Sequence, residues 1–150
     1  WRDRLHDGAY QRYLRRLIKE LRIEDSLVLL PVLSAAEVKA ELEAAELFVL
    51  PSLCENSPNA LCEAMLVGVP GIATFAGGIP SLLEDKKTGL LVPPGDPAQL
   101  VSAMRKLFND PVLAKRLATA AKSVALSRHE AEANAKAQLA VYRKIMEDAR

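Results

Sequence analysis

Short apolar runs alternate with helical segments along this chain, and the alternation restricts the folds that it can adopt. Four such runs are bounded by polar or turn-forming residues: 27–30, 47–50, 71–74 and 90–92. Continuous apolar runs of this length are typical of strands that are buried on both faces. Strands that alternate with helices pair in parallel and are joined by right-handed crossovers. The sequence therefore predicts an α/β fold with a parallel sheet.

The helical segments are marked by apolar residues at helical spacing and by residues that begin or end helices. Ser34 and Glu37 form a capping box, and Gly68 is suited to close a helix. We expect helices over 10–21, 35–45, 58–67, 80–84 and 130–147, and two more that begin after the capping residues Asp96 and Asp110. In the last helix we expect these apolar residues to point inward: Leu139, Tyr142, Ile145 and Met146.

Polar and turn-forming residues gather in the loops that follow the predicted strands. These loops are 31–34, 51–58, 75–79 and 93–95. Ligands of open parallel sheets bind outside the carboxyl ends of the strands, so we expect a binding site among these four loops.

The loop 51–58 and the helix after it carry the most informative constellation. Glu55 lies in the loop, Pro58 suits the first helical turn, and Glu63 lies within the helix. The amides at the start of this helix have no partners inside the helix, and with the helix dipole they favour phosphate or sugar oxygens. We expect three free amides there, those of Asn59, Ala60 and Leu61. Two carboxylates so far apart along a helix suit two parts of one elongated ligand.

The bulk composition excludes several classes of protein. A net charge of +1 over 150 residues argues against wholesale binding of nucleic acid, and no apolar run is long enough to span a bilayer. No signal peptide is visible. Cys54 and Cys62 stand outside any metal-ligand or disulfide pattern. We expect a cytoplasmic protein without a bound metal.

Five segments of the chain resemble the donor-binding domain of GT-B glycosyltransferases, specifically the retaining family 4 (glycosyl transferases group 1). They are Leu50-Pro51-Ser52, the pair Glu55 and Glu63 at the spacing of a Glu-x7-Glu motif, Gly68 to Ala73, Gly77 to Leu83, and Thr88 to Asp96. The resemblance implies a Rossmann-like three-layer α/β/α fold, the C-terminal half of a GT-B fold, with extra C-terminal helices.

The resemblance also implies roles for particular residues. Glu55 is the catalytic candidate, in contact with the transferred sugar, and Glu63 is expected to hold the ribose hydroxyls. The donor sugar and diphosphate are expected to contact Asn56, Ser57, Pro58, Asn59, Ala60, Gly77 and Gly78. The nucleobase is expected against Val32 and Leu33; Pro31 stands where the family often has glycine, which puts one amide contact in doubt.

The implied function is donor binding in a retaining glycosyltransferase (EC 2.4) that transfers a hexose-type sugar to an unknown acceptor. Residues 1–150 are expected to form one domain of a longer protein, lacking its first strand and the N-terminal acceptor domain, and to be inactive alone. The helix 130–147 is expected to brace the acceptor domain. The partner is a nucleotide-diphosphate sugar, used as co-substrate without a cofactor or metal. Peripheral membrane association of the complete protein is compatible with this picture.

Two other functions remain open from the sequence. One is a GT-B-fold epimerase that acts on a UDP-N-acetylhexosamine, and the other is a non-catalytic nucleotide-binding or interaction module. The segments Ser57 to Ala60 and Gly77 to Pro80 favour the transferase over the epimerase. The presence of both Glu55 and Glu63 argues against a module that has lost its catalytic residues.

Overall fold

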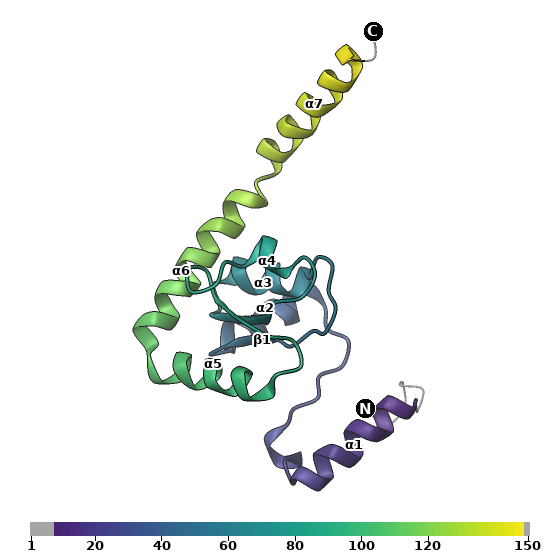
Figure 1. Ribbon diagram of the computed structural model, residues 1–150, viewed down its shortest axis with the longest axis vertical. Coiled ribbons are helices and arrows are strands. Elements are labelled where there is room, and N and C mark those ends of the chain that lie inside the picture. Colours follow the sequence, from purple (N-terminus) through teal and green to yellow (C-terminus); the bar gives the residue numbers. More distant parts are fainter. Residues whose placement is uncertain (1–7, 149–150) are drawn as a thin grey trace. The chain divides into compact units, whose positions relative to one another are not determined.

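The computed structural model describes residues 8–148 (Figure 1), and the chain divides into two units between Val38 and Lys39. The first unit contains helix α1 (Ala9–Leu21) and a 3₁₀ turn, η1 (Glu24–Ser26). Helix α1 ends at Arg22, which adopts a left-handed conformation with φ 53°. The helix predicted over 10–21 is confirmed.

The segment 27–30 is not a strand, so this prediction was wrong. It has no regular secondary structure and is exposed, with 84% of Val28 and 51% of Leu29 accessible to solvent. An apolar run becomes a buried strand only when a neighbouring strand accepts its hydrogen bonds and a layer covers it. No described segment pairs with 27–30. The apolar run alone is therefore not enough to form a strand, because the described residues supply no partner strand for it.

Helix α2 (Ala35–Ala44) begins with the predicted capping box. The backbone N–H and the hydroxyl of Ser34 both donate to Oε2 of Glu37 at 2.7 Å, and the Glu37 N–H donates back to the Ser34 hydroxyl at 3.4 Å. The side-chain hydrogen bond from Ser34, followed by its backbone hydrogen bond, lowers the pKa of Glu37. Local sequence alone specifies this helix start.

The second unit is built on a parallel sheet in the order β1 (Phe48–Leu50), β2 (Gly71–Thr74), β3 (Leu90–Val92). The register pairs Val49 with Ile72, and Ile72 with Leu90. Three of the four predicted strands are thus confirmed. Among the described residues, β1 has a ladder partner on one side only, so its other side is an open edge.

The helices of the second unit follow the predicted caps closely. They are α3 (Asn59–Val67), α4 (Ile79–Leu82), α5 (Pro97–Asn109), α6 (Pro111–Arg128) and α7 (Ala131–Asp148). Asp96 and Asp110 each accept a backbone N–H through the side chain, at 3.0 and 2.9 Å. Gly68 closes α3 in a left-handed conformation, and Lys122 of α6 donates to the nearby Val67 carbonyl at 3.2 Å.

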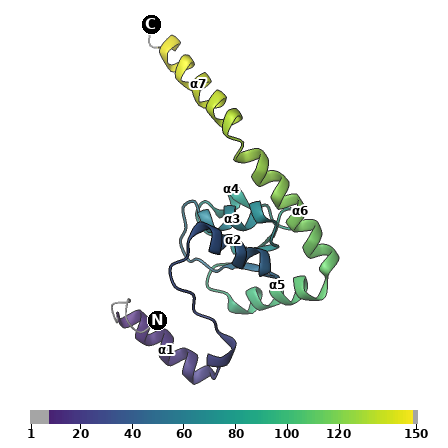
Figure 2. The same ribbon diagram turned by 180° about the vertical axis from the view of Figure 1, so that it is seen from behind.

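Alternate residues of β2 point into two apolar clusters on opposite faces of the sheet. Ala73 joins a cluster that contains Leu61 of α3 and Ile79 of α4. Ile72 joins the other cluster, with Leu107 of α5. Helix α6 contributes to both. The sheet is therefore the middle of three layers, with α3 and α4 on one face and α5 on the other (Figures 1 and 2). The α/β/α prediction is confirmed.

The apolar residues of α7 do not point inward, so this part of the prediction was wrong. Their exposed fractions are between 55% and 65%: Leu139, Tyr142, Ile145 and Met146. Their spacing is that of an amphipathic helix, but no described element covers them. Over residues 8–148, no helix is long and apolar enough to cross a bilayer.

The buried side chain of Leu117 provides a test of the packing. Leu117→Ala removes a fully buried side chain from the α5-side cluster, so we expect the free energy of unfolding to fall by about 2–5 kcal/mol. Val112 lies on the same helix and is 80% exposed. Val112→Ala should therefore change the free energy of unfolding by less than about 0.5 kcal/mol. Chemical denaturation measures both. Equal losses would contradict the two-cluster core.

Candidate functional site

The loop 51–58 leaves the carboxyl end of β1 and is tied to the end of β2. The hydroxyl of Thr74, the last residue of β2, donates to the Ser52 carbonyl at 2.5 Å. Thr74 is 3% exposed, so this bond is shielded from water. It fixes the start of the loop that carries Glu55.

The backbones of Gly77 and Gly78 pack directly on the backbone of the Glu55 loop. The Gly78 N–H donates to the Glu55 carbonyl at 3.1 Å. A Cβ on Gly77 would lie 1.6 Å from the Glu55 carbonyl oxygen, and one on Gly78 would lie 1.8 Å from that of Asn56. Gly77 also has a φ of +51°, which favours glycine. Close approach to the protein's own backbone therefore requires glycine at these two positions; their expected contact with the donor stays a prediction.

Helix α3 presents its amide end next to this loop. Pro58 is its N-cap, with φ −75° and ψ 105°. The Leu61 N–H donates to the Pro58 carbonyl at 3.1 Å, so the expectation that this amide is free was wrong: the first turn tightens and uses it. Among residues 8–148, the amides of Asn59 and Ala60 have no acceptor, and both residues are exposed. Two amides remain for a ligand.

The two carboxylates of the constellation flank the start of α3. Glu55 is partly buried, and its Oε1 accepts the Asn56 N–H at 3.0 Å. Glu63 is exposed, one turn after the first helical residue, Asn59; four residues correspond to a rise of about 6 Å. The side chains of Asn56 and Ser57, between Glu55 and the helix, are exposed as well.

The carboxyl ends of the three strands surround a hollow of about 180 Å³. It is lined by Pro51 and Pro93, which directly follow β1 and β3, and by Thr74, the last residue of β2. The hollow joins loops 51–58 and 93–95. The close contacts of Gly77 and Gly78 with the Glu55 loop bring loop 75–79 to the same edge, so three of the four expected loops gather there. Neither Glu55 nor Glu63 lines this hollow. A larger hollow of about 610 Å³ lies at the opposite edge, beside Leu47 and Pro70, where β1 and β2 begin. We place the candidate site at the carboxyl edge, because ligands of parallel sheets bind there.

Val32 and Leu33, expected to contact a base, belong to the first unit. Val32 is fully exposed and Leu33 is partly buried. Their role in base binding stays a prediction.

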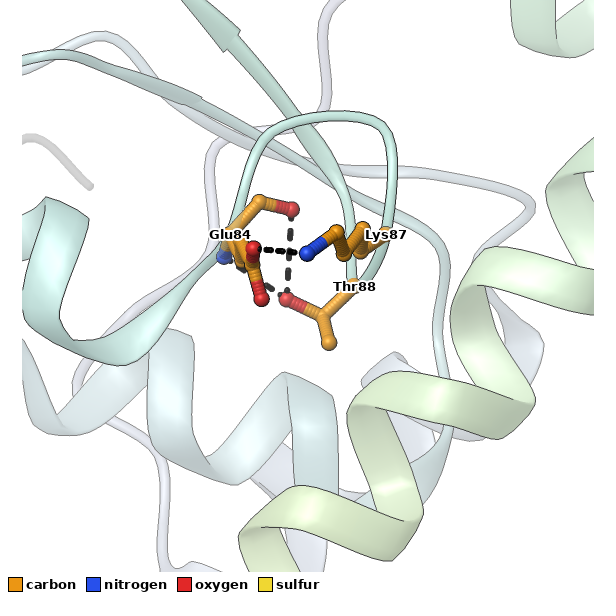
Figure 3. A network of polar contacts seen from close by, with 3 residues as sticks. All are labelled: Glu84, Lys87 and Thr88. Atoms are coloured by element: carbon orange, nitrogen blue, oxygen red, sulfur yellow. Dashed lines mark hydrogen bonds and ion pairs between the residues drawn. The ribbon is translucent and has the colours of Figure 1, made fainter.

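The turn at Thr88 and Gly89 has a structural role. The Glu84 N–H donates to the Thr88 hydroxyl at 2.8 Å, and Lys87 pairs with the Glu84 carboxylate at 2.5 Å (Figure 3). A Cβ on Gly89 would lie 2.7 Å from the Gly71 carbonyl. The turn thus brings β3 into register beside β2.

Cys62, directly before Glu63, is half-buried within α3. Burial raises the pKa of its thiol, and the positive charge of Arg128 opposes that rise. Arg128, at the end of α6, was not among the residues that the sequence singled out. No local pattern could have found it, because its contacts are distant in sequence. In the part of the chain that the structure describes, no three His, Cys, Asp or Glu residues are grouped to hold a metal ion.

Residues 7–124 match the family described as glycosyl transferases group 1. WcaL of Escherichia coli K12, which is named as a colanic acid biosynthesis glycosyltransferase, is 40% identical over 112 residues. That match covers 69% of this chain and 28% of WcaL.

Two solved structures share the fold. Sucrose-phosphate synthase from Thermosynechococcus elongatus is 28% identical with a TM-score of 0.85, over 97% of this chain and 37% of that protein. HepE (Alr3699) from Anabaena, solved in complex with UDP-glucose, is 26% identical with a TM-score of 0.78, over 83% of this chain and 34% of HepE. This chain therefore spans between 28% and 37% of the length of these three proteins.

Gly77→Ala tests the contact between the two loops. Because the new methyl group would collide with the Glu55 carbonyl, we expect the free energy of unfolding to fall by about 3–4 kcal/mol. Gly95→Ala is the matched control: its φ is also positive, at +75°, but its Cβ would lie 3.9 Å from the nearest atom. The control should lose only the conformational strain, about 1–2 kcal/mol. If thermal denaturation shows similar losses of stability in the two variants, the backbone contact at Gly77 does not require glycine.

Proposed function

We propose, from the premise that this chain belongs to the family of glycosyl transferases group 1, that it binds the donor in a retaining glycosyltransferase of family 4. Its fold matches GT-B glycosyltransferases. The enzyme would transfer a hexose-type sugar from a nucleotide-diphosphate sugar to an acceptor. The observation that carries the proposal is the site at the carboxyl edge, where Glu55 precedes the open amide end of α3 and Glu63 follows it.

The arrangement fits an extended, anionic ligand. The free amides of Asn59 and Ala60 suit phosphate or sugar oxygens. The exposed Glu63 carboxylate suits the two ribose hydroxyls, since a carboxylate accepts hydrogen bonds from two neighbouring donors. Asn56 and Ser57 offer further polar contacts to the sugar.

In this mechanism Glu55 orients the transferred sugar and stabilises the positive charge that develops as the glycosidic bond opens. The Asn56 N–H bond to its carboxylate holds Glu55 in place. Glu55 is not assigned as a covalent nucleophile. Transfer with retention of configuration and without a metal is part of the proposal.

A UDP-sugar is the first donor to test. HepE, 26% identical to this chain, was solved with UDP-glucose. The rise in melting temperature of the complete protein with UDP-, GDP- and ADP-sugars would show which nucleotide base it prefers. Isotope exchange at the second carbon of the sugar, without any acceptor, would instead indicate the epimerase.

The complete enzyme needs more than this chain. An acceptor domain and basic residues for the diphosphate would lie outside residues 1–150, and we expect this chain alone to bind nucleotide weakly without turnover. The exposed apolar residues of α7, such as Tyr142 and Ile145, support the proposal that this helix braces the acceptor domain.

Glu63→Ala in the complete protein should weaken donor binding by about 1.5–3 kcal/mol, because charged hydrogen bonds to the ribose are lost. Titration calorimetry with the donor measures this. Glu43→Ala removes another exposed helix carboxylate, paired with Lys39, and should leave the affinity unchanged. Unchanged affinity in Glu63→Ala would remove Glu63 from the site.

Glu55→Gln in the complete protein keeps the shape of the side chain but removes its charge. We expect kcat to fall by about 10²–10³-fold, the scale of losing one electrostatic contact to a transition state, while the donor Kd changes little. Steady-state kinetics and calorimetry separate the two effects. A large rise in Kd with unchanged kcat would reverse the roles of the two glutamates.

A further inference from the structure

Arg128, the last residue of α6, holds the short helix α4. Its Nη2 donates to the Ser81 carbonyl at 2.7 Å, across 47 residues of sequence. Helix α4 has a single turn, so its last carbonyls have no partners inside the helix. A guanidinium donor makes a charge-assisted and therefore stronger bond. This exposed bond thus ties the end of α6 to α4, which is also packed into the core through the buried Ile79.

The contact continues from α4 to the Glu55 loop. The Ser81 hydroxyl donates to the Gly78 carbonyl at 2.7 Å, and the Gly78 N–H donates to the Glu55 carbonyl at 3.1 Å. Gly78 is therefore held on both sides, by α4 and by the loop. Because its backbone also touches that of Asn56 so closely, a displacement of α4 must displace the loop.

The backbone around Arg128 is tied to both α6 and α7. The Arg128 carbonyl accepts a hydrogen bond from the Asn134 amide at 2.8 Å. The neighbouring His129 N–H donates to the carbonyl of Ala125 at 3.0 Å, and Ala125 is 2% exposed within the α3-side cluster. The charge of Arg128 also reaches Cys62 of α3, so the guanidinium acts close to both helices of that layer.

We propose that Arg128 is a positioning residue for the Glu55 loop. It holds α4 through Ser81, Ser81 holds Gly78, and Gly78 holds the backbone of Glu55. Arg128 itself does not touch the substrate. The consequence for sugar transfer rests on the proposed function, whereas the mechanical coupling does not.

Amide hydrogen exchange tests the coupling in the 150-residue chain without any ligand. In Arg128→Met we expect the Gly78 amide to exchange about two- to tenfold faster, the scale of one lost hydrogen bond. The Ile72 amide in β2 should keep its rate. Arg128→Lys keeps one charged donor and should restore most of the protection. Ser81→Ala removes only the hydroxyl bond to Gly78. The Ser81 N–H still donates to the Gly78 carbonyl at 3.1 Å, and the Ser81 carbonyl still accepts from Arg128, so this variant should have a smaller effect than Arg128→Met.

Arg116→Met is the matched control, because Arg116 is an exposed arginine on the same helix. It should leave the Gly78 amide unchanged. An unchanged Gly78 rate in Arg128→Met would overturn the inference. So would an equal increase at Ile72, because that would show a general loss of stability.

The kinetic consequence is measured in the complete protein. Arg128→Met should lower kcat about two- to tenfold with an unchanged donor Kd, and Arg128→Lys should recover most of it. A rise in the donor Kd with an unchanged kcat would overturn the positioning role. If the complete protein transfers no sugar from any of the donors tested, the proposed function fails, and the exchange rate of Gly78 still decides the coupling.

Discussion

The close contact between two backbone segments, Gly77-Gly78 and Glu55-Asn56, is the constraint on which the candidate site depends. Without side chains between them, the loop after β2 lies against the loop after β1. The Gly78 N–H then donates to the Glu55 carbonyl, with 3.1 Å between the nitrogen and the oxygen, and this bond holds the two loops together. A larger residue at either glycine would push the loops apart. The shape of the site is therefore set by backbone contact before any ligand arrives.

The layers of the second unit explain why this contact can be kept. Partly buried hydrogen bonds tie the strands to the loops. The Thr74 hydroxyl donates to the Ser52 carbonyl at 2.5 Å, and the Leu91 N–H donates to the Asp85 carboxylate at 2.9 Å. The two apolar clusters hold α3, α4 and α5 against the sheet, and α6 joins both clusters. The loops carry the polar groups while the framework below them is apolar. Such a division is common where a rigid scaffold positions functional residues.

The sequence predicted those elements whose signals are local. The caps at Ser34, Asp96 and Asp110 and the strand 71–74 were found because each depends on a few neighbouring residues. The segment 27–30 was predicted wrongly because a strand also needs a partner, and apolar composition does not show whether one is present. The Leu61 amide was expected to be free because a tightened first turn leaves no mark in the sequence.

The residues of the candidate site also separate into those that local sequence reveals and those that depend on distant contacts. Glu55, Glu63 and the paired glycines were visible because they lie close together in sequence. The physical reason for the glycines was not visible, since it depends on a backbone contact between segments more than twenty residues apart and not on a ligand. Arg128 was missed for a similar reason: its partner Ser81 is 47 residues away, and an arginine at a helix end is unremarkable by itself.

The open side of β1 has a consequence for handling the molecule. On the side away from β2, strand β1 has no partner strand among residues 8–148. Such edges recruit strands from other molecules, and Phe48, Val49 and Leu50 are only partly buried. At high concentration the isolated chain is therefore expected to add strand to strand into oligomers. A short added peptide that occupies this edge would be the direct way to keep it monomeric.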